Sequence, residues 1–301
     1  METKQEQVSK HEGLWRYVEN VRPEIEATLH SLLPVTPLNI ETLFNEALNY
    51  SLFPGGKRLR PVLTLLGAEI TGGSRERVIS AAAAIEYIHT SSLIFDDLPC
   101  MDNANERRGK LSLHAKYGEG LAVLVALALL NSSYGMIFAC HAKDTLLIRA
   151  HTELVECIGS HGMVAGQSID LSIENKSQLS DDIVTMRNLK TSALIRMALR
   201  VGAVLSNANE SQLKALSEFA DLIGDAYQTS DDLIDLQEDS TLFVDASHNQ
   251  ATTQKSPVSK ARQRVFDLTD AAKKVLSGEF GQNESAKLLC EMADYVSERK
   301  A

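Results

Sequence analysis

Two clusters of aspartate stand where apolar helical stripes end. One stripe, with members three and four residues apart, consists of Ala82, Ile85, His89, Ser92 and Asp96. A second stripe leads from Leu213, Leu216, Ala220, Ile223 and Tyr227 into Asp231 and Asp235. A carboxylate on a core-facing stripe is costly unless it is paired, protonated or bound to metal. Both stripes therefore predict bound cations.

The carboxylate oxygens of these clusters indicate which cation they bind. The first cluster contains Asp96, Asp97 and Asp102, and Pro99 between them should end or kink the helix and let Asp102 return toward the other two. The members of the second cluster are Asp231, Asp232 and Asp235. Oxygen ligands favour Mg²⁺, with Mn²⁺ as a substitute, over zinc. Mg²⁺ usually shares its site with water and substrate phosphate, so we expect a phosphorylated substrate. For one cluster taken alone, a solvated helix end is an equal alternative.

Two short basic groups could hold that phosphate. The segment FPGGKRLRP contains Lys57, Arg58 and Arg60, and the segment NERRGK contains Arg107, Arg108 and Lys110. Arginine forks and lysine point charges suit diphosphate oxygens. A run of charges is usually a solvated face, but its position beside the first acidic cluster favours phosphate binding here. Neither GxGxxG nor a Walker A pattern is present.

Helices must position these residues. The segment from Cys100 to Ser256 contains no proline, and apolar residues recur at three and four rather than in alternation. We therefore predict an all-α chain that forms a single domain over residues 1–301. Breaks between helices are expected at residues 32–37, 53–56, 71–74, 116–120 and 159–162. The polar segment from Asp239 to Pro257 is predicted to be a mobile loop.

Composition excludes several classes of protein. The net charge of −10 opposes binding to nucleic acid. The longest apolar run, Leu121 to Leu130, is about half of what a membrane-spanning helix needs, so we expect no membrane span. The first residues match neither a signal peptide nor a transit peptide, so a cytoplasmic location is expected. The four cysteines are too sparse for a disulfide framework.

In order and spacing, these motifs resemble the trans-isoprenyl diphosphate synthases. The segments that carry the resemblance are FPGGKRLRP, IHTSSLIFDDLPCMDNANERRGK, GQSIDL, LKTSALI and YQTSDDLID, from about Phe53 to Asp235. The resemblance implies the isoprenoid synthase fold, with roughly ten or more helices around a deep central cavity. It also implies a homodimer. The implied reaction is the Mg²⁺-assisted condensation of isopentenyl diphosphate with an allylic diphosphate, by ionisation, condensation and elimination.

The resemblance assigns roles to residues at matching positions. The implied metal ligands are Asp96, Asp97, Asp102, Asp231, Asp232 and Asp235. The allylic diphosphate would contact Arg107, Lys190 and Gln228, and isopentenyl diphosphate would contact Lys57, Arg60, His89 and Arg108. Thr191 and Gln228 would turn dipoles toward the carbocation, while Gln167 and Asp170 would line or brace the cavity. His89 as a general base or as a satisfied core histidine remains an alternative to its role as a ligand.

Product length is expected to depend on the helix before Asp96, because the growing hydrocarbon would run back along it. Family members with short products have a bulky aromatic residue four or five positions before the first aspartate, where this chain has Ser91 and Ser92. The residues that could close the pocket deeper are Ile88, Leu124 and Leu127. We expect the C20 product geranylgeranyl diphosphate, with C15 and longer products as alternatives.

Several positions depart from the family pattern. Phe95 replaces a usual histidine, Leu127 stands where a Gly-Asp pair is common, and Met186–Arg187 lack a further histidine. The segment around Val244 lacks the usual lysine, for which Lys255 could partly substitute. Such a loss would weaken substrate binding by about 1–3 kcal/mol. All six motif aspartates remain, which favours an active enzyme over a weakly active or non-catalytic subunit of a heteromeric synthase, and over a class I terpene synthase.

Overall fold

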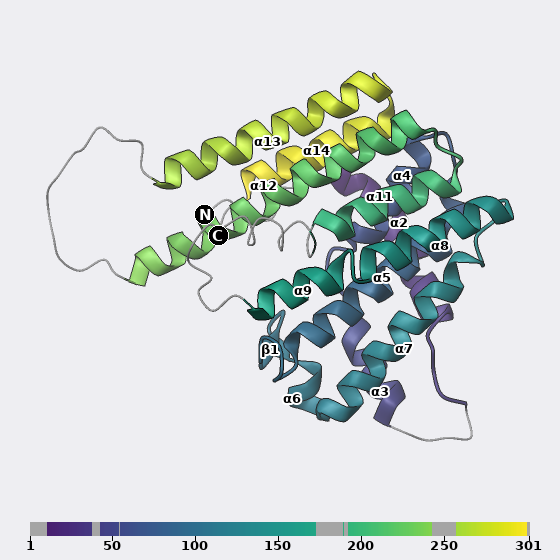
Figure 1. Ribbon diagram of the computed structural model, residues 1–301, viewed down its shortest axis with the longest axis vertical. Coiled ribbons are helices and arrows are strands. Elements are labelled where there is room, and N and C mark those ends of the chain that lie inside the picture. Colours follow the sequence, from purple (N-terminus) through teal and green to yellow (C-terminus); the bar gives the residue numbers. More distant parts are fainter. Residues whose placement is uncertain are drawn as a thin grey trace, which may run out of the picture. The chain divides into compact units, whose positions relative to one another are not determined.

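The computed structural model describes residues 11–37, 43–53, 55–172, 189, 192–242 and 257–299, with the backbone alone described for 235–242 and 257. Within these ranges the regular structure is helical apart from one short hairpin, which confirms the all-α prediction (Figure 1). The chain divides into two compact units. Each unit is considered by itself, and the single domain with a central cavity stays a prediction.

Unit 2 comprises residues 18–155 and 197–208. Its elements, in chain order, are most of α2 (Glu12–Ser31), α3 (Leu43–Leu52), α4 (Leu59–Ile70), α5 (Arg75–Asp97), β1 (Glu106–Arg107), β2 (Lys110–Leu111), α6 (Leu113–Tyr117), α7 (Glu119–Ile137), most of α8 (Asp144–Ile158) and most of α11 (Ala193–Leu205).

Helix α5 is the core of unit 2, because its middle is buried against α4 and α7. The small side chains from Ala81 to Ala84 are at most 1% exposed, and they let neighbouring helices approach closely. The Tyr87 hydroxyl donates a hydrogen bond to the Leu29 carbonyl at 2.8 Å, which ties α5 to α2. A rigid α5 fixes the positions of His89 and of the aspartates at its end.

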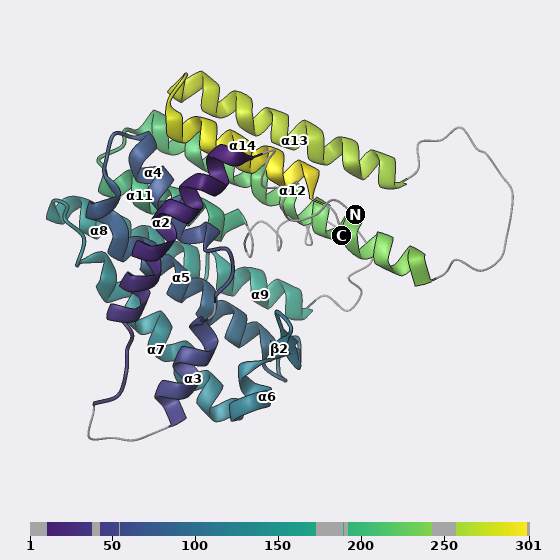
Figure 2. The ribbon, with the colours of Figure 1, turned by 180° about the vertical axis from the view of Figure 1, so that it is seen from behind.

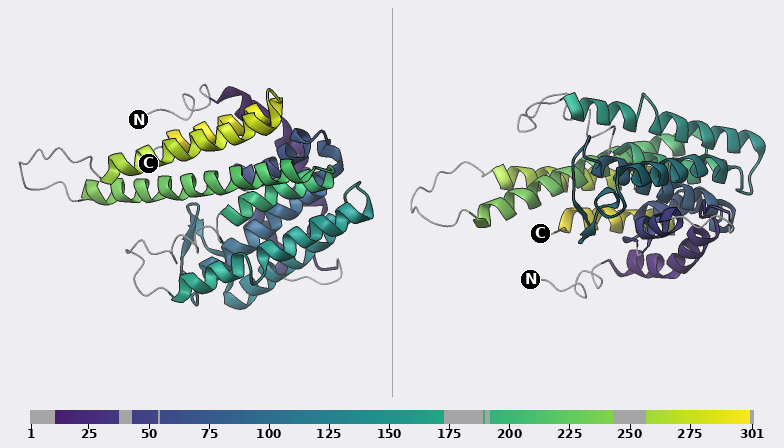
Figure 3. Two further views of the ribbon diagram at one scale, coloured as in Figure 1. Left: turned by 45° about the horizontal axis from the view of Figure 1, so that its top comes forward. Right: turned by 90° about the horizontal axis from the view of Figure 1, so that it is seen from below.

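Unit 1 comprises residues 1–17, 156–196 and 209–301. Its complete helices are α9 (Met163–Ser172), α12 (Glu210–Leu242), α13 (Pro257–Phe280) and α14 (Glu284–Glu298). Figures 2 and 3 show α12, α13 and α14 side by side as a layer of helices. The start of α2 joins this layer, since the Trp15 and Tyr295 rings meet edge to face with centroids 5.2 Å apart.

The predicted helix breaks are confirmed. Helices α2, α3, α4, α6 and α8 end at Ser31, Leu52, Ile70, Tyr117 and Ile158, at or just before the punctuated segments. The prediction of a loop from Asp239 to Pro257 was wrong at both ends. Helix α12 continues to Leu242, because an established helix gains one hydrogen bond for each added residue, and Pro257 opens α13, where a proline is tolerated in the first turn. Residues 243–256 lie outside the described ranges.

Two described helices, α5 and α7, are long and apolar enough to cross a membrane. The apolar window of α5 is 72% buried, so its apolar side chains serve the core of unit 2. The corresponding window of α7 is only 39% buried. Much of the apolar surface of α7 is therefore exposed in the described structure.

Candidate active site

The acidic end of α5 folds back on itself. The helix ends at Asp97, and the backbone of Leu98 leaves the helical region with ψ 150°. The amide of Asp102 then donates to the Asp96 carbonyl at 2.9 Å, and the amide of Ala104 donates to the Asp97 carbonyl at 3.2 Å. As Pro99 predicts, the turn brings Asp102 back beside the first two aspartates.

Asp97 and Arg107 are paired with each other. The Arg107 Nε donates to the two carboxylate oxygens of Asp97 at 3.0 and 3.3 Å, and its Nη2 also contacts Oδ1. This hydrogen bonding raises the pKa of Arg107. The Asp97 side chain is 5% exposed, whereas Asp96 is half-buried and Asp102 is exposed. Asp97 is therefore the most buried of the three aspartates, and Arg107 pairs with it directly.

Arg107 and Arg108 lie on a short hairpin formed by β1 and β2. The paired residues are Arg107 and Lys110, with Arg108 and Gly109 as the two turn residues. Their φ angles of 54° and 73° are those of a type I′ turn. A positive φ is unusual for arginine. Here the turn requires it, and the turn backbone sets the position of the Arg108 side chain.

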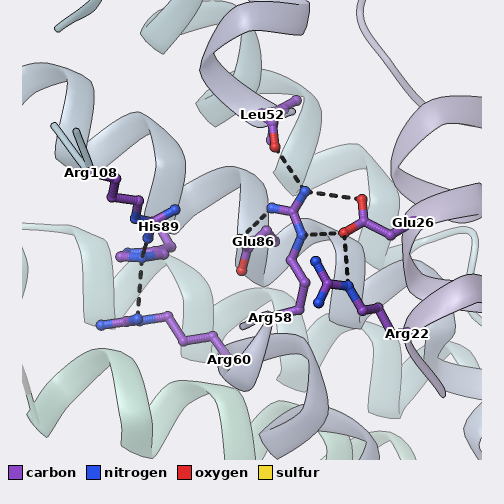
Figure 4. A network of polar contacts seen from close by, with 8 residues as sticks. All are labelled: Arg22, Glu26, Leu52, Arg58, Arg60, Glu86, His89 and Arg108. Carbon is purple, nitrogen blue, oxygen red and sulfur yellow. Dashed lines mark hydrogen bonds and ion pairs between the residues drawn. The ribbon is translucent and has the colours of Figure 1, made fainter. Parts of the chain in front are cut away.

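Arg60, His89 and Arg108 form a group that we call the cradle (Figure 4). The His89 Nε2 lies 3.2 Å from an Arg60 guanidinium nitrogen and 3.4 Å from an Arg108 guanidinium nitrogen. Burial, followed by the charges of Arg60 and Arg108, lowers the pKa of His89 well below its ordinary value. A neutral imidazole accepts from both guanidinium groups and lets two positive charges converge, which is a suitable arrangement for a polyanion.

Arg58 does not face the cradle. Its guanidinium contacts Glu86 at 2.7 Å, the two carboxylate oxygens of Glu26 at 2.9 and 3.0 Å, and the Leu52 carbonyl at 2.8 Å (Figure 4). The interpretation of Arg58 as a phosphate-type cation is therefore corrected. Its side chain is 1% exposed and its backbone is left-handed, with φ 55°, so it turns inward and anchors the loop that carries Lys57 and leads into Arg60 in the first turn of α4.

A pocket of about 380 Å³ opens between this loop, the end of α5 and the hairpin. Its lining includes Gly56, Asp97, Arg107, Arg108 and Lys110. Three cations against one carboxylate make the pocket electropositive. Lys57 is exposed and Arg60 is half-buried. Unit 2 therefore brings together Arg60, His89 and Arg108, three of the four residues that the sequence analysis assigned to isopentenyl diphosphate. The fourth, Lys57, lies just before α4.

The second aspartate cluster belongs to unit 1. Gln228, Asp231 and Asp232 are half-buried on α12, and Asp235 continues the helix with only its backbone described. Gln167 is half-buried and Asp170 is 7% exposed, one turn apart on α9. Predicted residues that lie outside the described ranges are Lys190, Thr191, Val244 and Lys255. The structure thus describes the two aspartate clusters separately.

The described carboxylates fit an Mg²⁺ ion whose remaining ligands are water and substrate phosphate. Within the described ranges, no three His, Cys, Asp or Glu side chains converge closely enough to hold a metal by themselves. The backbone does bring Asp96 and Asp102 together, and both side chains are accessible. Mg²⁺ commonly takes one or two carboxylates and completes its octahedral shell with water and substrate phosphate. The donor set therefore fits a metal that arrives with a phosphorylated substrate.

The residues predicted to set product length differ in their surroundings. Ser91 is 1% exposed and its hydroxyl donates to the Ala126 carbonyl on α7 at 2.9 Å. Ser92 is half-buried and lies one turn before Asp96 on the same helix face. Ile88 is 2% exposed, whereas Leu124 and Leu127 are 55% and 54% exposed. Of the two serines, Ser92 is therefore the one aligned with the aspartates.

The sequence analysis missed the partners of Arg58 and one contact of Asp231. Glu86 occurs three residues before His89, a helical spacing that could have placed it near the cradle. Arg299 contacts the Asp231 carboxylate at 2.8 Å. No local pattern links two residues so far apart in the sequence.

Known proteins resemble this chain over most of its length. Residues 41–284 match the family model for polyprenyl synthetase. The chain is 36% identical over 266 residues to "Geranylgeranyl pyrophosphate synthase, chloroplastic" of Capsicum annuum, covering 85% of this chain and 72% of that protein. It is also 36% identical over 293 residues to "Heterodimeric geranylgeranyl pyrophosphate synthase large subunit 1, chloroplastic" of Arabidopsis thaliana, covering 92% and 76%.

A solved structure is similar in its fold. The crystal structure of an FPP/GFPP synthase from Zymomonas mobilis is 33% identical and superposes with a TM-score of 0.82, covering 95% of this chain and 99% of that one. The helical architecture is thus the isoprenoid synthase fold, as predicted. The chain is a member of the polyprenyl synthetase family, and it is a trans-prenyltransferase-type polyprenyl diphosphate synthase.

Proposed function

We propose that the protein condenses isopentenyl diphosphate with an allylic diphosphate to make C20 geranylgeranyl diphosphate. The observation that carries the proposal is the cradle, in which Arg60 and Arg108 converge on a neutral His89 beside an electropositive pocket. Two fixed guanidinium groups can hold a diphosphate without metal. The relatives named for geranylgeranyl pyrophosphate support the C20 product.

The aspartates would hold the allylic partner. The proposed Mg²⁺ ligands, with Mn²⁺ as a substitute, form two separate clusters. One is Asp96 and Asp102 at the end of α5, and the other is Asp231, Asp232 and Asp235 on α12. When bound, the metal neutralises the allylic diphosphate so that its C–O bond can ionise. Arg107 holds Asp97 in place, and we assign Asp97 to orienting this arginine at the mouth of the pocket.

The chain's own residues then position the second substrate. The cradle and Lys57 hold isopentenyl diphosphate so that its double bond attacks the allylic cation and a new C–C bond forms. The released diphosphate takes the proton lost in the final elimination, so no protein nucleophile is needed. Fixed positive charge that requires no reorganisation during the reaction is the main contribution of these residues.

We also propose that the active protein is a homodimer. The exposed apolar residues Val123, Leu124 and Leu127 form a stripe on α7, where they are 39%, 55% and 54% exposed. A contiguous apolar helix face of this kind suits a subunit interface. The cytoplasmic location stays a prediction.

Substrate binding in the absence of metal tests whether the cradle holds isopentenyl diphosphate. Calorimetric titration of isopentenyl diphosphate in EDTA should show binding to the wild-type protein. Arg108→Gln should weaken it about tenfold or more, the effect of losing a charge-assisted hydrogen bond. Arg264→Gln, which removes an arginine that is paired with Asp225 at 2.9 Å on unit 1, is the control and should bind normally. Equal affinity of all three proteins would contradict the assignment of the cradle.

A further inference from the structure

Arg299 contacts the first aspartate of the second cluster. Its Nη1 lies 2.8 Å from Asp231 Oδ1, and the side chains are 18% and 34% exposed. Its guanidinium carbon lies 4.0 Å from the centroid of the Tyr227 ring, one helical turn before Asp231. All three residues belong to unit 1, where Arg299 directly follows α14 and the other two lie on α12. Figure 3 shows these helices in one layer.

The contact is held by charge and by the aromatic ring rather than by an aligned hydrogen bond. Among the described residues, the buried Nη1 has no hydrogen-bond partner of acceptable geometry, although Oδ1 lies within ion-pair distance. A guanidinium over an aromatic face gains a cation–π interaction, which keeps Arg299 in place without fixing the direction of its N–H groups. Such a pair is readily exchanged for another cation.

Asp231 needs a positive partner whether or not metal is bound. It is half-buried at the end of the apolar stripe of α12, where an uncompensated carboxylate would be costly. Arg299 supplies that charge in the structure. Mg²⁺ requires oxygen ligands at about 2.0–2.1 Å, so a metal at Oδ1 and a guanidinium at the same oxygen compete for one site.

We propose that Arg299 is a positioning residue that serves as the exchangeable counter-ion of Asp231. It neutralises and orients the carboxylate in the metal-free protein and yields Oδ1 when the metal binds. The inference rests on the proposed function, because that function makes Asp231 a metal ligand. Loss of Arg299 should therefore strengthen metal binding to the substrate-free protein. If the arginine served only to stabilise the fold, its loss would not strengthen metal binding.

Titration of the substrate-free protein with Mn²⁺, followed by electron paramagnetic resonance, tests this inference. Arg299→Gln should raise the Mn²⁺ affinity about two- to fivefold, the effect of a partly exposed ion pair. The matched control is Arg264→Gln, because Arg264 on α13 contacts Asp225 at 2.9 Å, and Asp225 lies on α12 outside the aspartate cluster. The control should titrate like the wild-type protein, and adding Asp231→Asn to Arg299→Gln should abolish the gain.

Three outcomes would overturn the inference. They are an unchanged or weakened Mn²⁺ affinity in Arg299→Gln, an equal gain in Arg264→Gln, and no Mn²⁺ binding by any variant. Because the titration contains no substrate, it is independent of condensation. A protein that makes no prenyl product but shows the predicted gain would refute the proposed function and retain the exchange at Asp231.

Discussion

The Glu86→Gln substitution tests whether the buried Arg58 network holds the loop that leads into α4 and Arg60. The Arg58 and Glu86 side chains are 1% and 4% exposed and lie 2.7 Å apart, so water cannot replace the lost charge. Removing one partner of a buried pair costs about 3–5 kcal/mol. The glutamine amide can still accept a hydrogen bond and Glu26 keeps its charge, so we expect about 2–3 kcal/mol.

Urea unfolding followed by circular dichroism measures this change. With a slope of about 2–3 kcal/mol per molar urea, the midpoint should fall by about 1 M. The control is Asp270→Asn, which removes the exposed pair with Lys274 and should cost less than about 1 kcal/mol. A Glu86→Gln midpoint as high as that of the control would refute the reasoning. The anchored loop carries Lys57 and leads into Arg60 at the start of α4, so the same variant should also raise KM for isopentenyl diphosphate.

Two further predictions concern α5, which carries both His89 and Ser92. Folding lowers the pKa of His89, so its neutral form contributes stability above about pH 6.5 that is lost as the pH falls toward the folded-state value. Below pH 6.5 the free energy of unfolding of the wild-type protein, measured in urea, should therefore fall by up to about 1.4 kcal/mol per pH unit more than that of His89→Gln. Equal pH dependence of the two free energies would contradict this prediction. Ser92→Phe should shorten the product to C15 or less, because Ser92 is aligned with Asp96, and chromatography of the dephosphorylated products measures this length. Ser91→Phe should instead destabilise the packing of α5 against α7, because Ser91 bonds to the Ala126 carbonyl. A wild-type product no longer than C15, unchanged in Ser92→Phe, would contradict the proposed pocket.

Much of the fold follows from local pattern. Glycine and proline mark the ends of helices because they change backbone freedom at single positions, and the chain does break at those segments. The return of Asp102 to Asp96 follows from Pro99 in the same way. The continuation of α12 to Leu242 did not follow, because a polar segment attached to a long helix can extend it without an apolar stripe.

The site is less predictable because it depends on the direction of individual side chains. Arg58 and Arg60 are both cations in one basic segment, yet only the left-handed backbone of Arg58 turns its side chain inward to Glu86. The pairing of Arg107 with Asp97 depends on a hairpin of two-residue strands, which is too short to give an alternating pattern. Arg299 reaches Asp231 through packing of helices, which spacing along the chain does not encode.

The central claim, that the protein elongates an allylic diphosphate to C20, has one direct test. The purified protein is incubated with Mg²⁺, labelled isopentenyl diphosphate and a C5, C10 or C15 primer, and the dephosphorylated products are sized. We predict a labelled C20 alcohol that disappears with EDTA and is strongly reduced in Asp96→Asn. Absence of any labelled prenyl product with all three primers would contradict the proposed function.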